Sequence, residues 1–255
     1  MPQGSITGYI DVAQLTLYAF WIFFAFLILY LRREDRREGY PLLSDKGLPV
    51  KVRGIPLRSA PKMFRLQHGS YVLDRPEREV AAIPTAPWAG APLEPTGNPL
   101  VDGVGAAAYA DRADVPELTY DDGVPKIVPL RVATDFVIAS EDANPVGMKV
   151  VATDGVVVGT IADAWVDRSE YILRYLEAAI TTATGPRHIL IPMNLLQISA
   201  ETRRVRVRSL TGAQFALVPT LAHPDQVTLL EEDKVMAYFG GGSLYATASR
   251  LGPIL

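Results

Sequence analysis

The sequence VAQLTLYAFWIFFAFLILYL, residues 12–31, contains no charged side chain. As an α-helix, twenty residues measure about 30 Å, which is the thickness of the hydrocarbon core of a bilayer. A cleaved signal peptide would instead need basic residues before a shorter apolar run, and no Lys or Arg precedes Arg32. The run therefore predicts a single transmembrane helix.

Basic residues lie on only one side of this run. Asp11 precedes it, and an arginine cluster follows it, made of Arg32, Arg33, Arg36 and Arg37. The positive-inside rule then predicts that residues 1–11 are periplasmic and residues 32–255 cytoplasmic. The arginine cluster is expected at the lipid headgroups, and specific lipid binding by it together with Tyr40 is a further hypothesis. Because a lone helix cannot form a transport pathway, anchoring or assembly is its expected role.

The composition argues against several classes of function. The 25 basic and 28 acidic residues give a net charge of −3, which provides no reason to expect nucleic acid as a partner. There is no cysteine, and the sequence contains neither a G-x-S-x-G nor an H-E-x-x-H motif. The histidines His68, His188 and His223 are not spaced as metal ligands. We therefore expect no catalytic residues and no bound metal in this chain.

Residues 32–110 are predicted to be a juxtamembrane and extended segment. Thirteen of the 20 prolines lie between positions 41 and 129, so a long helix cannot form there. A disordered linker is one interpretation. An ordered segment supported by a partner is favoured, because a solvated linker seldom carries large apolar side chains such as Phe64, Tyr71, Trp88 and Tyr109.

Residues 111–255 are predicted to form a mainly-β domain with a C-terminal helix. Short β-type runs bounded by turn residues suggest a small antiparallel barrel, with strands at 148–152, 156–161, 173–180, 188–191 and 204–208. The last run places Arg204, Arg206 and Arg208 on one face, which usually means a solvated face, with phosphate binding as the alternative. A capping box at 228–231 predicts a helix over 229–239 that ends at Gly240.

Several short motifs, in this order and spacing, resemble one known family, the H subunit of the purple-bacterial photosynthetic reaction centre. They are YID at 9–11, YAFWIF at 18–23, REGYPL at 37–42, DGVG at 102–105, PKIVP at 125–129, AWVDRSE at 164–170, RYLE at 174–177, VTLLEEDK at 227–234 and GGGSLY at 240–245. The resemblance implies one transmembrane helix, an extended region lying on partner subunits, and a cytoplasmic barrel of the PRC type.

The same resemblance implies the partners and the setting. The chain would cap the L and M subunits in the inner, intracytoplasmic membrane, in contact with membrane lipids, and a light-harvesting antenna ring is a further candidate partner. It would bind no cofactor alone, while the complex carries bacteriochlorophyll, bacteriopheophytin, quinones and a non-haem iron. A rival interpretation is a membrane-anchored PRC-barrel adaptor that binds another protein or RNA. The 15 basic against 23 acidic groups of residues 66–255 argue against RNA.

Reduction of a quinone to quinol consumes two protons, and carboxylates with ordered water can relay them. By resemblance, Glu170 is the first candidate for this role. The surrounding network would contain Asp167, Arg174, Lys126, Glu117 and Glu232. Asp121 and Asp122 could form an acidic mouth, where the sequence lacks the histidines of other family members. The plain alternative is that Asp167 and Glu170 only end a turn between two strands, with arginines as solvated partners.

Overall fold

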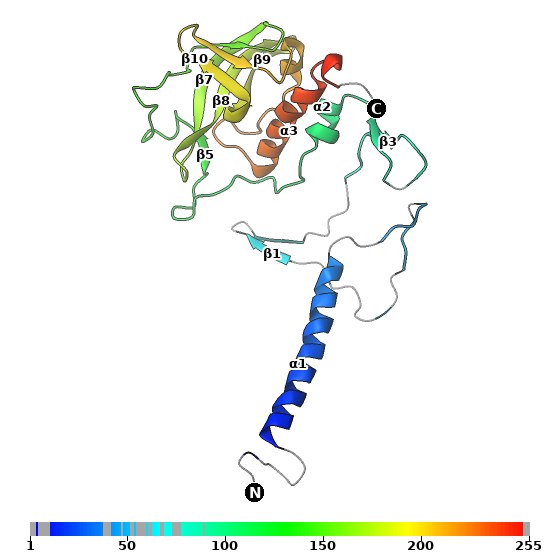
Figure 1. Ribbon diagram of the computed structural model, residues 1–255. Helices are drawn as coiled ribbons and strands as arrows, with labels where there is room; N and C mark the ends of the chain where they lie inside the picture. The colour runs from blue at the N-terminus through cyan, green and yellow to red at the C-terminus, as the bar shows by residue number, and fades with distance from the viewer. Residues whose placement is uncertain are drawn as a thin grey trace. The chain divides into compact units, whose positions relative to one another are not determined.

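The computed structural model describes residues 4, 11–37, 42–46, 48–51, 54, 60, 63–66, 69–72, 78–88 and 90–251. The chain divides into two compact units (Figure 1). The first contains Met1–Arg78 and Pro84–Pro92, and the second contains Glu79–Ile83 and Leu93–Leu255.

The first unit is dominated by the helix α1 (Val12–Glu34), which continues into the 3-10 turn η1 (Asp35–Arg37). Asp11 caps the helix, since its side chain accepts a hydrogen bond of 2.7 Å from the backbone N–H of Gln14. No residue of α1 is buried, and the span Val12–Arg37 is long and apolar enough to cross a membrane. The predicted apolar helix is confirmed, and it fits a single-pass membrane protein.

Beyond α1, the described elements of this region are short. The strands β1 (Met63–Leu66) and β2 (Gly69–Val72) pair as an antiparallel hairpin. Further along the chain, β3 (Ala82–Pro84) and β4 (Leu93–Pro95) form another two-stranded sheet. Both β3 and β4 end at a proline, which cannot donate to a sheet ladder.

A curled seven-stranded sheet forms the centre of the second unit (Figure 1). Its strands are β5 (Ile127–Pro129), β6 (Lys149–Val151), β7 (Val157–Asp167), β8 (Ile172–Thr182), β9 (Gly185–Pro192), β10 (Leu196–Ser199) and β11 (Arg204–Val207). The order is β10-β11-β6-β7-β8-β9, with β5 paired to β7. The predicted mainly-β barrel domain is confirmed. One pair departs from the expected antiparallel pattern, since β11 runs parallel to β6.

The helix α3 (Leu229–Tyr245) packs with the sheet and begins at the predicted capping box. Thr228 Oγ1 accepts from the N–H of Glu231 at 3.1 Å, while the Glu231 carboxylate accepts from the N–H of Thr228 at 2.9 Å. The short elements α2 (Pro99–Asp102) and η2 (Gly105–Ala107) lie against this helix.

The prediction that α3 ends at Gly240 was wrong, because the helix continues through three glycines to Tyr245. A Cβ atom at Gly241 would lie 2.5 Å from Cβ of Ala107, and one at Gly242 would lie 2.4 Å from the carbonyl oxygen of Ser209. These glycines therefore allow close packing of the helix against its neighbours rather than terminating it.

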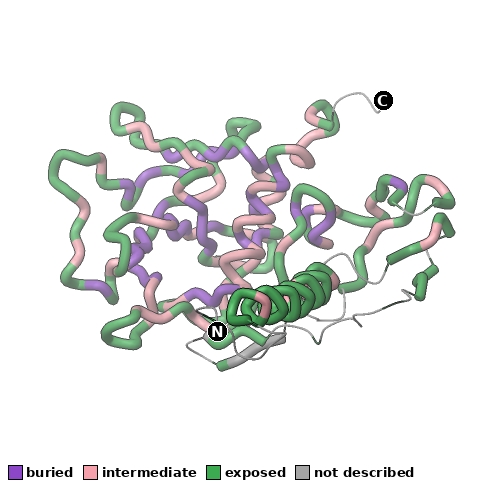
Figure 2. The backbone as a smooth tube through the Cα atoms, turned by 60° about the horizontal axis from the view of Figure 1, so that its bottom comes forward, coloured by how far each residue is buried: buried purple, intermediate pink, exposed green. Residues whose placement is uncertain are grey.

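The core of the second unit lies between the curled sheet and α3. Trp165, Phe215, Tyr238 and Phe239 are its largest fully buried side chains. In Figure 2 the buried segments follow the strands and α3. This core holds the ends of β7 and β8 in place, where most of the predicted site residues lie.

Candidate functional site

Asp167 is the last residue of β7, and its side chain is fully buried. Its Oδ1 atom accepts hydrogen bonds from the backbone N–H groups of Ser169 at 2.9 Å and Glu170 at 3.0 Å. Tyr171 completes the turn into β8 with a φ of 57°. A carboxylate bonded to the following backbone is a common way to build a tight turn. Asp167 thus shapes the turn that carries Glu170.

Two cationic side chains face the other oxygen of Asp167. Lys126 Nζ lies 3.6 Å and Arg174 Nε lies 3.2 Å from Oδ2. The register explains why they meet, because β5, which follows Lys126 directly, pairs Ile127 with Asp167. Burial alone would lower the pKa of both Lys126 and Arg174, but the neighbouring carboxylates outweigh it and raise both pKa values.

Two further carboxylates complete this group. Glu170 lies 2.8 Å from an Arg174 guanidinium nitrogen and 3.7 Å from Lys126 Nζ, and Glu117 lies 3.5 Å from Lys126 Nζ. We call these residues the acid–base cluster: Glu117, Lys126, Asp167, Glu170 and Arg174. The side chain of Glu170 is 50% exposed, so the cluster runs from a fully buried carboxylate to solvent.

Glu232 lies in the first turn of α3 and is linked to the cluster through a cavity. Its carboxylate accepts a hydrogen bond of 2.8 Å from the Tyr175 hydroxyl. Burial raises the pKa of Glu232, although the bond from Tyr175 opposes the shift, and burial also raises the pKa of Tyr175. Arg174, Tyr175 and Glu232 line one cavity of about 410 Å³, which is large enough for several water molecules.

The remaining predicted residues lie outside the cluster. Asp121 and Asp122 are exposed in the turn closed by the hydrogen bond from Gly123 N–H to the Thr119 carbonyl. Within the described parts of the chain, neither aspartate forms an ion pair with the cluster. Tyr40 lies outside the described residues.

The arginine cluster follows α1 directly. Arg37 pairs with Glu34 at 2.5 Å and also donates to the carbonyl of Ala60, while Arg32 lies 4.0 Å from Asp35. Arg32 and Arg33 occupy the last turn of α1, where positive charge is favourable for the helix dipole.

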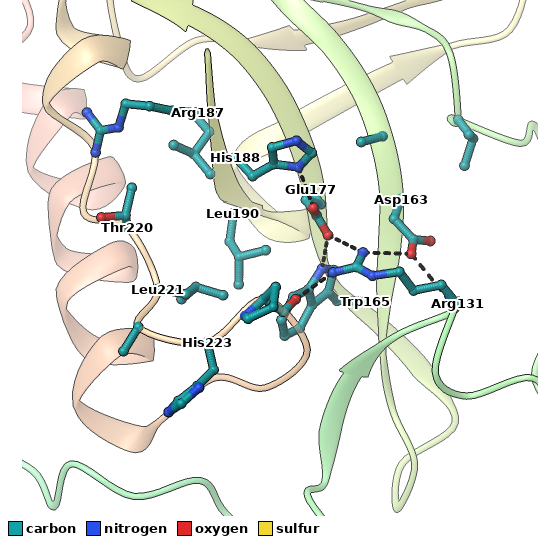
Figure 3. Close-up of a pocket in the computed structure, with 15 residues that line it drawn as sticks. Arg131, Asp163, Trp165, Glu177, Arg187, His188, Leu190, Thr220, Leu221 and His223 are labelled. Atoms are coloured by element: carbon teal, nitrogen blue, oxygen red, sulfur yellow. Dashed lines mark hydrogen bonds and ion pairs between the residues drawn. The ribbon is translucent and has the colours of Figure 1, made fainter. Parts of the chain in front are cut away.

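A second charged group, which the sequence reasoning missed, lies further along β7 and β8, where Asp163 pairs with Glu177. The buried carboxylate of Glu177 on β8 accepts from Arg131 at 2.6 Å and from the Trp165 indole N–H at 2.9 Å, and it contacts His188 Nδ1 at 2.6 Å (Figure 3). Burial alone would raise the pKa of Glu177, but these hydrogen bonds outweigh it and lower the pKa. The available signal was a charged residue inside the apolar run YLEAAI at 175–180.

Arg131 connects this carboxylate to two further segments. It pairs with Asp163 on β7 at 3.0 Å and with Asp225 at 3.1 Å, and it donates to the carbonyl of Pro224. Arg131, Asp163, Glu177 and Pro224 line a cavity of about 920 Å³ together with His188 and His223. The network fastens the 220–225 loop to the barrel. No group of three potential metal ligands occurs among the residues that the structure describes.

Two family models match the chain. The model of the photosynthetic reaction centre H-chain N-terminal region matches residues 4–132, which include α1, the extended region, Glu117 and Lys126. The model of the PRC-barrel domain matches residues 138–214, which include β6 to β11 and therefore Asp167, Glu170 and Arg174. The two matches follow one another along the chain and extend over residues 4–132 and 138–214, so they include parts of both compact units. The chain therefore belongs to the H-chain family of the photosynthetic reaction centre.

Proposed function

We propose that this chain caps the L and M subunits of a reaction centre on the cytoplasmic side and assists proton delivery to the secondary quinone. The acid–base cluster around Asp167 is the observation that carries the proton-delivery part. The capping part rests on the H-chain family, whose members are structural subunits of a light-driven complex that contains pigments and quinones.

The proposed topology has residues 1–11 in the periplasm, residues 12–31 in the inner, intracytoplasmic membrane, and the remainder in the cytoplasm. The four arginines directly after the apolar run support this orientation. We further propose that residues 32–110 lie along the partner subunits, with residues 111–255 as the cytoplasmic domain. Large exposed side chains in the extended region, among them Leu48, Ile83 and Trp88, support a covering partner.

The cluster divides into positioning and proton-carrying groups in this proposal. Asp167 is bonded to two backbone N–H groups and two cations, so it holds Lys126 and Arg174 in place. Glu170 contacts both of these cations and is half exposed, so it can take a proton from solvent at the edge of the cluster. Glu170 is accordingly the first proton acceptor.

Glu232 is the next proton carrier. Its raised pKa brings the protonated form closer to physiological pH, which favours both uptake and release of a proton. The cavity that it shares with Arg174 can hold bridging water, and water-mediated hydrogen bonds transfer protons over distances that direct contacts do not span. The route runs from Glu170 past Arg174 to Glu232.

The substitution Glu170→Gln tests this route in the purified complex. It keeps the side-chain volume but removes the proton-binding carboxylate, so proton-coupled second electron transfer to the quinone should slow by about tenfold or more. The first, light-driven charge separation should keep its rate. Both steps are followed by flash-induced absorption changes.

The control is Glu201→Gln, which changes an exposed glutamate on the turn between β10 and β11. This variant should leave both steps unchanged. Equal slowing of both steps in Glu170→Gln would indicate a structural defect, and unchanged second transfer would remove Glu170 from the route.

The assembly part of the proposal has its own test. The complex that copurifies with this chain from mildly solubilised native membranes should show near-infrared bands that bleach reversibly under illumination. A colourless preparation would contradict the capping role and favour the rival adaptor. The match of the H-chain model to α1 and the extended region, outside the barrel, supports the reaction-centre assignment over a general PRC-barrel adaptor.

A further inference from the structure

A pocket of about 460 Å³ lies beside β10, β11 and the last turn of α3. It is separate from the acid–base cluster and from the Glu177 network, since it shares no lining residue with either. Its polar lining consists of Asn194, Arg206, Arg208, Ser209, Ser243 and Arg250.

The charge of this pocket has one sign. Its three charged lining residues are Arg206, Arg208 and Arg250, and no acidic residue lines it. In the described part of the chain, none of these arginines forms an ion pair. Three guanidinium groups without a carboxylate create a local positive potential that attracts anions.

Two of these arginines are available to a ligand. Arg206 lies in β11 and Arg208 follows that strand directly, and both residues are exposed. Arg208 donates one hydrogen bond of 3.1 Å to Gln197, and no hydrogen bond of the Arg206 side chain occurs with the residues described. Most of their N–H donors are therefore directed to solvent or to a ligand.

Arg250 is fixed in the wall of the pocket. It donates to the carbonyls of Gly242, Arg208 and Ser209 at 2.9, 2.8 and 3.2 Å, and to Thr153 Oγ1 at 2.9 Å. The Gly242 carbonyl belongs to the C-terminal end of α3, whose partial negative charge would otherwise repel an anion. Arg250 offsets that charge and keeps its own positive charge in the pocket.

Ser209 provides an independent observation. The residue is 4% exposed, and its hydroxyl oxygen is buried without a hydrogen-bond partner among the described residues. A buried hydroxyl without a partner is unfavourable, and such groups often mark the place of a water or an ion. Ser209 is one of the residues that line the pocket, so its hydroxyl is a candidate donor to an anion that the arginines attract.

We propose that the pocket lined by Arg206, Arg208, Ser209 and Arg250 binds a phosphate-type oxyanion. Guanidinium groups recognise phosphate through paired N–H donors, and a hydroxyl adds a further donor to a remaining oxygen. The pocket shares Asn194 with the cavity of the proposed proton route but contains none of the titratable groups of that route, so either proposal can fail without the other. It also reverses the expectation that the arginine row on β11 is only a solvated face.

The test is calorimetric titration of inorganic phosphate into the purified intact complex at low ionic strength. Saturable binding is expected, and Arg206→Gln and Arg208→Gln should each weaken it by about tenfold or more. Ser209→Ala should weaken it several-fold without lowering the stability of the phosphate-free protein. The matched control is Arg204→Gln, which removes the same charge from the same face of β11 outside the pocket.

Each result has a defined consequence. Absence of saturable phosphate binding, or an equal loss of affinity in Arg204→Gln, would overturn the site. Unchanged affinity in Ser209→Ala would overturn the role of the hydroxyl. The urea midpoints of the arginine variants should match the parent, because both side chains are exposed.

Free phosphate and a lipid headgroup share this chemistry. A second titration with monomeric, short-chain phosphatidylglycerol separates them. If phosphatidylglycerol binds and its binding is lost in Arg206→Gln, the site also accepts a lipid headgroup. If phosphate binds but phosphatidylglycerol does not, the site accepts only soluble phosphate compounds.

Discussion

Replacement of Glu177 is expected to destabilise the barrel by an amount that depends on the residue introduced. Glu177→Ala leaves the indole N–H of Trp165 buried without an acceptor, which costs about 1–3 kcal/mol. Arg131 retains Asp163 and Asp225, so the loss of its partly exposed pair with Glu177 costs about 1 kcal/mol. Loss of the buried Cγ methylene adds about 1 kcal/mol, and the sum is about 4 kcal/mol.

Glu177→Gln should be milder, at about 1–2 kcal/mol, because the amide oxygen still accepts one of the hydrogen bonds and the volume is kept. The free energy of unfolding can be followed in the complex by urea titration with pulse proteolysis of this chain. With a slope of about 2 kcal/mol per molar urea, the midpoint should fall by about 2 M for Ala and by less than 1 M for Gln. Glu201→Gln serves as the unaffected control.

The pH dependence gives a sharper check. The pKa of Glu177 is lowered in the folded protein, so its carboxylate stabilises the fold at pH values above its ordinary pKa of about 4.3. This stabilisation is lost as the pH falls through the lower folded-state pKa. The difference in free energy of unfolding between the parent and Glu177→Gln should therefore become smaller below about pH 4. The stabilising role of the Glu177 carboxylate would be refuted if this difference in free energy of unfolding stayed constant with pH. It would also be refuted if Glu177→Gln and Glu177→Ala lowered the free energy of unfolding equally.

Three other predictions concern α3 and are measured by the same urea titration. Gly242→Ala should destabilise the protein by about 2 kcal/mol or more, because the new Cβ would lie 2.4 Å from the Ser209 carbonyl oxygen. The control Gly240→Ala should not destabilise the protein, because no atom lies within 4 Å of its Cβ. Thr228→Ala should cost about 1–2 kcal/mol through loss of the N-cap, with Thr228→Ser retaining most of the stability. Glu232→Gln should raise the midpoint at pH 8, because burial raises the pKa of Glu232 and so disfavours its charged form. That gain should vanish as the pH falls below the ordinary pKa of a glutamate, and a midpoint below the parent's at pH 8 would contradict the assignment.

Much of the fold could be predicted from local patterns. Three patterns could be recognised from residues that are neighbours in sequence: the uncharged run at 12–31, the β-type runs and the Thr228 capping box. Each pattern corresponds to an observed element. Two features depended on distant residues and were missed. Helix α3 continues past Gly240 because Ala107 and Ser209 approach it closely, and β11 runs parallel to β6.

The acid–base cluster was predicted through family resemblance rather than through spacing. Residues 117 and 126 are far from residue 167 in sequence, and the pairing of β5 with β7 brings Lys126 next to Asp167. The Glu177 network was not predicted for a related reason. Its partners Arg131, Trp165 and His188 come from separate segments, and the sequence offered only a glutamate among apolar neighbours.

The parallel pairing of β11 with β6 constrains the order in which the protein can be made. Lys149 on β6 cannot meet Arg204 on β11 until the intervening hairpins have been synthesised, and pairing over such a long sequence separation is slow. Helix α1 emerges from the ribosome long before that. A growing chain can therefore engage the bilayer while its barrel is still open, and the sheet closes only when the last quarter of the polypeptide is available.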